Sequence, residues 1–142
     1  MSRIAAAFAA AAADDRAALV AYLPGGFPDE ARFLEAATAV LEHADLLEVG
    51  VPFSDPLGDG PVIQRAGEAA LAAGATTARV LGMVARLRER TDKPLLLMTY
   101  YNPIYCFPGG DAGFAQAAKA AGADGVILPD LPPEDPQVWS QP

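Results

Sequence analysis

The chain has 142 residues, of which 52% are hydrophobic and 20% charged, and its formal net charge is −8. This composition predicts one folded globular domain and argues against a disordered chain. With 10 basic against 18 acidic residues, no basic stripe is available for a phosphate backbone, which argues against a nucleic-acid partner. A single cysteine, Cys106, and a single histidine, His43, exclude an intrachain disulfide and a histidine-rich metal site. We expect His43 at the surface near a helix end and Cys106 as a partly buried filler.

The alanine-rich N-terminus has the outline of a weak signal peptide, but its spacing favours a different interpretation. Ile4 and Phe8 are four residues apart and precede Asp14, which predicts a short helix packed along one edge. No apolar run approaches the roughly 18 residues that a membrane span requires.

Strands and helices alternate along the rest of the chain. Residues 17–23 form an apolar run ended by Pro24, which predicts a strand buried on both faces. Apolar positions at helical spacing predict a helix from 28 to 42, with acidic residues in its first turn. Further elements are predicted in this order: a strand at 44–49, helices at 61–73 and 76–90, a strand at 94–100, a helix at 111–121 closed by Gly122, and a strand at 123–129.

This alternation predicts an α/β fold with a parallel sheet and helical crossovers. Two architectures fit four such units: the first half of a (β/α)8 barrel, or an open four-stranded sheet of flavodoxin-like type. Both place functional residues in the loops that follow the strands. The end of the chain differs, because residues 132–142 contain four prolines where a fourth helix should run. We therefore expect a barrel half at 1–131 and a divergent, truncated tail at 132–142.

Glu48 interrupts the apolar run of its predicted strand, at residues 46–49. A carboxyl group buried in a parallel sheet is costly without a purpose or a partner. Burial disfavours the charged form of a carboxyl, which suits a group that donates a proton as a general acid and takes one back as a base. The alternative is a structural carboxylate bound to an arginine or to loop amides.

Asp59 lies in the following loop between Gly58 and Gly60, whose backbone freedom permits the loop to move over a site. An ionised aspartate there could stabilise positive charge or accept an N–H from a substrate ring. The alternative is a simple turn residue. Asp55, before Pro56, fits a turn residue or a partner contact better.

Residues 47–60 read LEVGVPFSDPLGDG, and this segment resembles the signature of tryptophan synthase α chains. Supporting segments follow in the same order as in that family: YLPGGFP at 22–28, PVIQ at 61–64, MTYYNP at 98–103 and DLP at 130–132. The resemblance covers nearly all of residues 1–131, and it reaches only the first four of the family's eight β/α units.

The resemblance implies a (β/α)8 barrel lyase of tryptophan biosynthesis. It would cleave indole-3-glycerol phosphate to indole and glyceraldehyde 3-phosphate by a retro-aldol reaction, with no metal and no cofactor of its own. In family terms Glu48 is the catalytic acid and base, and Asp59 stabilises the protonated indolenine. The implied substrate-binding residues are Tyr22, Tyr100, Leu128 and Pro129, the last two near the indole wall.

The resemblance also implies a protein partner, the tryptophan synthase β chain, in a cytoplasmic α2β2 heterotetramer. The pyridoxal phosphate of that complex belongs to the β chain. The residues that match the family's contacts with the β chain are Pro52, Asp55, Pro56 and Asn102. Loops after the later strands of the family hold the substrate phosphate, and those strands lie beyond the matched half.

Three interpretations follow. The first is a truncated α-chain lyase with little or no activity of its own. The second is a non-catalytic module that keeps the loop for the β chain. The third is another phosphate-handling barrel enzyme, which the complete carboxylate signature disfavours.

Overall fold

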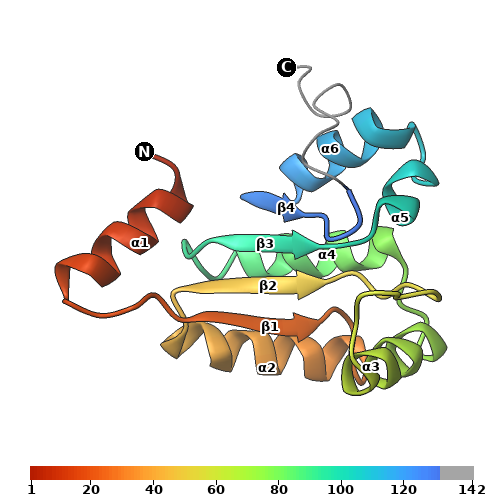
Figure 1. Cartoon of the computed structure of the whole chain (residues 1–142), viewed down its shortest axis with the longest axis horizontal. Helices are drawn as coiled ribbons and strands as arrows, with labels where there is room; N and C mark the ends of the chain where they lie inside the picture. The colour runs from red at the N-terminus through yellow and green to blue at the C-terminus, as the bar shows by residue number, and fades with distance from the viewer. Residues whose placement is uncertain (132–142) are drawn as a thin grey trace.

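The computed structural model describes residues 1–131, so the predicted tail at 132–142 lies outside the described residues. The elements along the chain (Figure 1) are α1 (Arg3–Ala13), β1 (Val20–Pro24), α2 (Glu30–His43), β2 (Leu46–Gly50), α3 (Pro61–Ala72), α4 (Thr77–Arg88), β3 (Leu95–Met98), α5 (Tyr101–Tyr105), α6 (Gly110–Ala120) and β4 (Gly125–Ile127). Within residues 1–131, no helix is long and apolar enough to cross a membrane.

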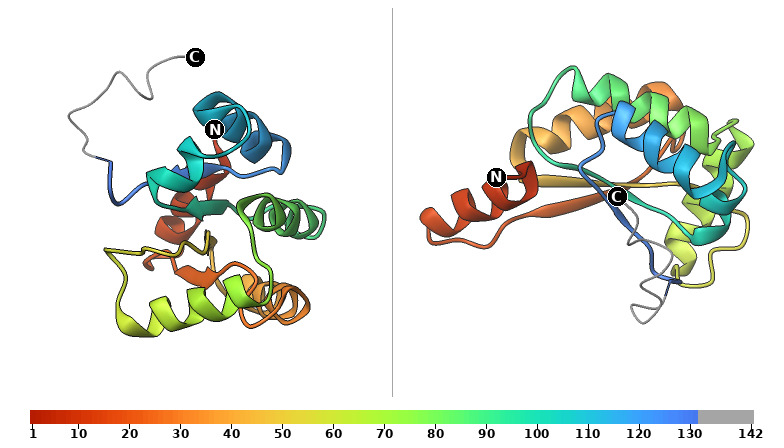
Figure 2. Two further views of the ribbon diagram at one scale, coloured as in Figure 1. Left: turned by 90° about the vertical axis from the view of Figure 1, so that its right-hand side faces the viewer. Right: turned by 90° about the horizontal axis from the view of Figure 1, so that it is seen from above.

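The strands form one parallel sheet in the order β1-β2-β3-β4. Helices α2, α4 and α6 cover one face of this sheet, whereas α1 lies beyond the amino ends of the strands (Figures 1 and 2). A flavodoxin-like sheet has its first strand inside the sheet and helices on both faces. Sequential strands with their helices on one side are the arrangement of a (β/α)8 barrel. The α/β class and the half-barrel prediction are therefore confirmed.

The hydrophobic core lies between the sheet and the helices. Alternate strand residues point into it, because side chains along a strand alternate between the two faces. Each fully buried leucine or phenylalanine contributes about 1.5–3 kcal/mol. The core residues include Leu47 and Val49 of β2, Leu95 and Leu97 of β3, Phe33, Leu34 and Leu41 of α2, Val80, Val84 and Leu87 of α4, and Phe114 of α6.

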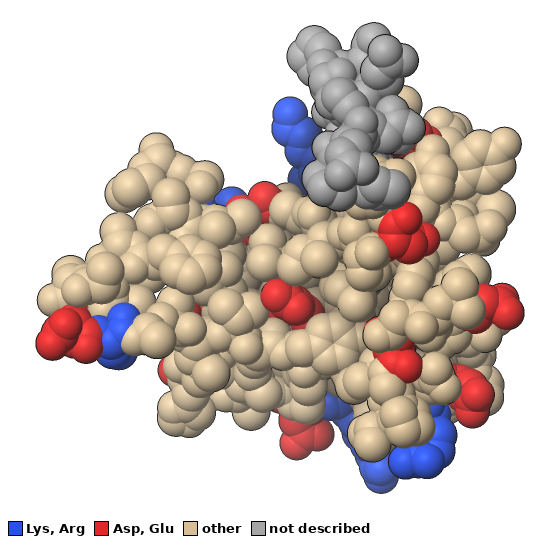
Figure 3. All heavy atoms as spheres, viewed as in Figure 1, with Lys and Arg blue, Asp and Glu red and all other residues tan. Residues whose placement is uncertain are grey.

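The opposite face of the sheet, which we call the inner face, carries no helix over its middle. Val20 of β1 is 39% exposed and Ile127 of β4 is 37% exposed, so the prediction of a first strand buried on both faces is wrong for the described residues. Figure 3 shows this face as largely uncharged, with single acidic side chains within it and basic side chains at its margins. The unpaired edges of β1 and β4 border it.

Helix α1 was expected to pack through Ile4 and Phe8. Ile4 lies against Gly125 of β4, whereas Phe8 is 50% exposed, so that part of the prediction is wrong. Ala11 is the buried residue of this helix.

Three further expectations concern individual residues and one loop. His43 is exposed at the end of α2, as predicted, while Cys106 is exposed and not the expected partly buried filler. Helix α5 was not predicted, since no helix is expected between the strand at 94–100 and the helix at 111–121. The first N–H of this helix, from Tyr101, donates to both carboxylate oxygens of Asp130 at 3.0 and 3.1 Å. An acceptor from a distant segment therefore pairs with a donor that has no partner within the helix.

Asp45 connects the segment before β1 to the start of β2. Its carboxylate accepts two hydrogen bonds from Arg16, at 2.6 and 2.8 Å, and one from the Leu19 N–H at 2.7 Å. The Arg16 guanidinium, followed by the Leu19 amide, holds the pKa of Asp45 well below its usual range. This carboxylate therefore helps to position β1 beside β2.

The Asp45 contacts predict a pH-dependent stability. Because folding lowers this pKa, the carboxylate stabilises the fold above the ordinary aspartate pKa of about 4, and its contribution is lost as the pH falls below that value. Asp45→Asn should therefore be clearly less stable than the parent chain in urea unfolding at pH 7, and the difference should shrink towards pH 3. Asp92→Asn, at an exposed carboxylate, is the matched control and should change little. An Asp45→Asn deficit that is equal at both pH values would contradict this role.

Candidate active site

The register of the sheet places Glu48 in a row of side chains that cross the inner face. Tyr22 of β1 is the partner of Glu48, and Glu48 is the partner of Leu96 of β3. Residues in register on adjacent strands point to the same face. The phenol and the carboxylate therefore both project towards the open inner face, away from the hydrophobic core.

Glu48 is only partly buried, so the prediction of a fully buried carboxyl is wrong for this chain. The cause is the open inner face, because no described helix lies over the middle of the sheet on that side. Among residues 1–131 the carboxylate of Glu48 has no hydrogen bond or ion pair. The alternative of a carboxylate held by an arginine or by loop amides is therefore not what the described chain shows.

Asp59 reaches the same region from the loop between β2 and α3. It lines a small cavity of about 20 Å³ together with Tyr22, Gly50 and Ile63. Its N–H donates to the carbonyl of Pro56 at 3.3 Å, so residues 56–59 form a turn, which we call the Asp59 turn. The structure thus brings the loop carboxylate to the end of the row that contains Glu48.

The pKa values of Tyr22 and Tyr100 respond to the nearby carboxylates. Burial, followed by the negative charges of Asp59, Tyr100 and Glu48, raises the pKa of Tyr22 to about 12. Burial also raises the pKa of Tyr100, an effect that the nearby Asp59 increases and the N–H of Gly58 opposes. Both phenols are therefore neutral near pH 7 and can donate hydrogen bonds.

Gly50 makes room for Tyr22. A Cβ atom built at Gly50 would overlap the hydroxyl and ring of Tyr22, so the phenol lies directly over the glycine backbone. Only a residue without a side chain permits this approach. The glycine that ends β2 therefore fixes where the Tyr22 hydroxyl can be.

A family model described as "Tryptophan synthase alpha chain" matches residues 8–141 of the chain. The chain belongs to the tryptophan synthase alpha chain family. Its relatives include the tryptophan synthase alpha chains of Deinococcus radiodurans, 54% identical over 94% of this chain and 49% of the relative, and of Gluconacetobacter diazotrophicus, 51% identical over 100% and 52%. The chain spans about half the length of the curated relatives it matches.

Solved structures agree with this assignment. Tryptophan synthase from M. tuberculosis in an aminoacrylate-bound form matches with a TM-score of 0.91 and 42% identity, over 98% of this chain and 56% of that one. The tryptophan synthase α subunit of Legionella pneumophila str. Paris matches with a TM-score of 0.89 and 42% identity, over 98% and 55%. The four-stranded unit is thus half of the barrel found in these tryptophan synthase alpha structures.

The other predicted substrate residues differ in where they lie. Leu128 packs against the helix-side core, and Pro129 is exposed after the end of β4. Tyr100, in contrast, is buried at the end of β3, and its hydroxyl accepts the N–H of Gly58 at 2.8 Å. The structure therefore brings Tyr22 and Tyr100 together with Glu48 and Asp59, and does not add Leu128 to that group.

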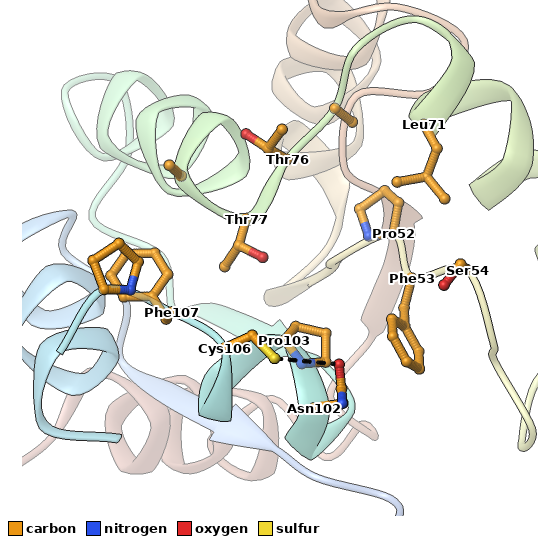
Figure 4. A pocket seen from close by; sticks show the side chains of 13 residues that line it. Pro52, Phe53, Ser54, Leu71, Thr76, Thr77, Asn102, Pro103, Cys106 and Phe107 are labelled. Carbon is orange, nitrogen blue, oxygen red and sulfur yellow. Dashed lines mark hydrogen bonds between the residues drawn. The ribbon is translucent and has the colours of Figure 1, made fainter. Parts of the chain in front are cut away.

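Two of the four residues predicted to contact a β chain share an open pocket of about 440 Å³. Figure 4 shows Pro52, in the chain after β2, and Asn102, in helix α5, at this pocket, with Phe53 and Phe107 among the other lining side chains. Asp55 is exposed and accepts the Ser54 hydroxyl at 2.6 Å. Pro56 lines the small cavity beside Asp59 instead.

Sequence reasoning missed three residues of this region. The ring of Phe53 lies 5.7 Å from that of Tyr100, Asp130 binds the first N–H of α5, and Gln64 bonds to the Asp59 turn. All three stand in the segments at 47–60, 61–64 and 130–132 that resemble the family, so these segments are the signal that could have found them. Among residues 1–131, no group of three or more His, Cys, Asp or Glu residues is placed to hold a metal ion.

The contact between Gly50 and Tyr22 predicts the effect of a small substitution. Gly50→Ala should push the Tyr22 ring out of its half-buried position, and the pKa of Tyr22 should fall from about 12 towards the ordinary tyrosine value of about 10. NMR titration of the tyrosine ring carbons measures this change. Gly82→Ala, on α4, is the matched control, because a Cβ at Gly82 meets nothing within 4 Å. An unchanged Tyr22 titration in Gly50→Ala would show that the glycine is not what positions the phenol.

Proposed function

We propose that the chain supplies the carboxylate half of a lyase that cleaves indole-3-glycerol phosphate to indole and glyceraldehyde 3-phosphate. The observation that supports this most strongly is the gathering of Glu48, Asp59, Tyr22 and Tyr100 at one end of the inner face. Membership of the tryptophan synthase alpha chain family supports the choice of reaction. The chain needs no cofactor of its own in this proposal.

The reaction breaks the carbon–carbon bond between the indole ring and the glycerol chain. One proton is added to the ring carbon, and one is removed from the hydroxyl group that becomes the aldehyde, so no oxidant or water is consumed. Glu48 is the group proposed to move these protons, since its carboxylate has no partner among the described residues and can act as acid and base. Asp59 would stabilise the positive charge on the protonated ring.

The two phenols complete the proposed ring pocket. Tyr22 and Tyr100 are neutral hydrogen-bond donors beside two carboxylates, and their rings offer apolar contact to a flat aromatic substrate. In the family, the substrate phosphate is held by loops after the later strands. Because a substrate must be held in place for proton transfer to be fast, we propose that residues 1–142 need the second half of a barrel for turnover.

A hybrid barrel tests this proposal. Residues 1–131 are joined to the corresponding second half of the Deinococcus radiodurans relative, which this chain covers to 49%, and indole release from indole-3-glycerol phosphate is measured. Glu48→Gln should lower kcat by about 10²–10⁴-fold, the range for loss of a general acid–base. Asp59→Asn should lower it by about 10²–10³-fold, the range for loss of an electrostatic stabiliser.

Two controls accompany the hybrid. Glu42→Gln changes an exposed carboxylate on α2 and should leave activity unchanged, and the 142-residue chain alone should release little or no indole. If Glu48→Gln keeps activity within about threefold of the hybrid, the assignment of Glu48 is wrong. Release of indole by the chain alone at the rate of the hybrid would overturn the need for a second half.

A non-catalytic module that binds a tryptophan synthase β chain is the second candidate. The open pocket between the loop at Pro52 and helix α5 at Asn102 supports it, since an apolar hollow at the carboxyl ends of the strands suits insertion of a partner's side chain. The hybrid barrel also distinguishes the lyase from the binding module. β-chain binding by an inactive hybrid would favour the module over the lyase.

A further inference from the structure

Gln64 lies in the first turn of α3 and reaches back over the end of the helix. Its side-chain amide donates to the carbonyl of Asp59 at 2.9 Å and to that of Pro56 at 3.4 Å. Its own backbone N–H donates to Gly60 at 3.0 Å. A single side chain thus bonds both ends of the Asp59 turn to a helix.

The Asp59 turn has few other contacts that could hold it. Leu57, within the turn, is 94% exposed and adds no apolar burial. On the sheet side, the N–H of Gly58 donates to the Tyr100 hydroxyl at 2.8 Å. The turn is therefore bonded to α3 through Gln64 and, through Tyr100, to the segment that follows β3.

We propose that Gln64 is a positioning residue for Asp59, which fixes the turn to α3 through its two amide donations. A carboxylate that stabilises charge must be held within a fraction of an ångström, and backbone glycines at 58 and 60 leave the turn free to move without such bonds. Through Gln64, Asp59 follows any displacement of α3. The inference rests on the proposed function only for what Asp59 does, and its geometry is independent of it.

The test uses the 142-residue chain labelled with 15N, and the readout is the backbone order parameter of residues 58–60. Gln64→Leu keeps the size of the side chain and removes both donations, so the order parameters should fall from about 0.85 to below about 0.6, the values for rigid and flexible backbone. Gln64→Lys keeps a side-chain hydrogen-bond donor at this position and should retain the parent values. Gln116→Leu, at an exposed position of α6, is the matched control and should also retain them.

Two results would overturn the proposal. One is a Gln64→Leu chain whose residues 58–60 remain as ordered as in the parent. The other is a Gln64→Lys chain as mobile there as Gln64→Leu, which would show that shape and not hydrogen bonding matters. If Gln64→Leu does not fold, Gln64→Met carries the same comparison. Failure of the proposed function would appear in a different experiment, as an Asp59→Asn hybrid that keeps its activity. That result would not change the order parameters of residues 58–60.

Discussion

Alternation of side chains along four parallel strands determines which residues can do chemistry in this chain. Because α2, α4 and α6 cover one face, every second strand residue is used for the core, and those between them must point to the inner face. Leu47 and Val49 are therefore core residues, while Glu48 between them is not. The same register aligns Tyr22 with Glu48. A one-residue slip of β2 would reverse this assignment and bury the carboxylate among the helices.

The second carboxylate depends on a loop and not on the sheet. Asp59 belongs to a turn that exposes Leu57, and Gly58 and Gly60 flank the aspartate, so backbone preference alone does not place it. Hydrogen bonds from Gln64 and to Tyr100 connect the turn to two elements that are themselves packed. The resulting cluster combines two acidic groups with two neutral phenols, which is the chemistry expected for proton transfer to and from an aromatic ring.

Hydrophobic periodicity was sufficient to predict the strands, helices α2, α4 and α6, and their order along the chain. It was not sufficient for features that depend on distant residues. The first N–H of helix α5, from Tyr101, donates to Asp130, which is 29 residues further along the chain. A local sequence pattern cannot predict such a bond. Glu48 was expected to be buried because its strand is apolar, but exposure of the inner face depends on what covers the sheet. The resemblance predicted Glu48 and Asp59 as the catalytic carboxylates, and only the structure showed Gln64 bonded to the Asp59 turn.

The central claim is that Glu48 and Asp59 act on one substrate in one step. Measuring kcat/KM for the Glu48→Gln/Asp59→Asn double variant of the hybrid barrel tests it most directly. If the two carboxylates act as a unit, the loss in the double variant should be close to the loss in Glu48→Gln alone, because without ring protonation there is no positive charge for Asp59 to stabilise. A loss equal to the product of the two single losses would show that the residues act independently and would contradict the account.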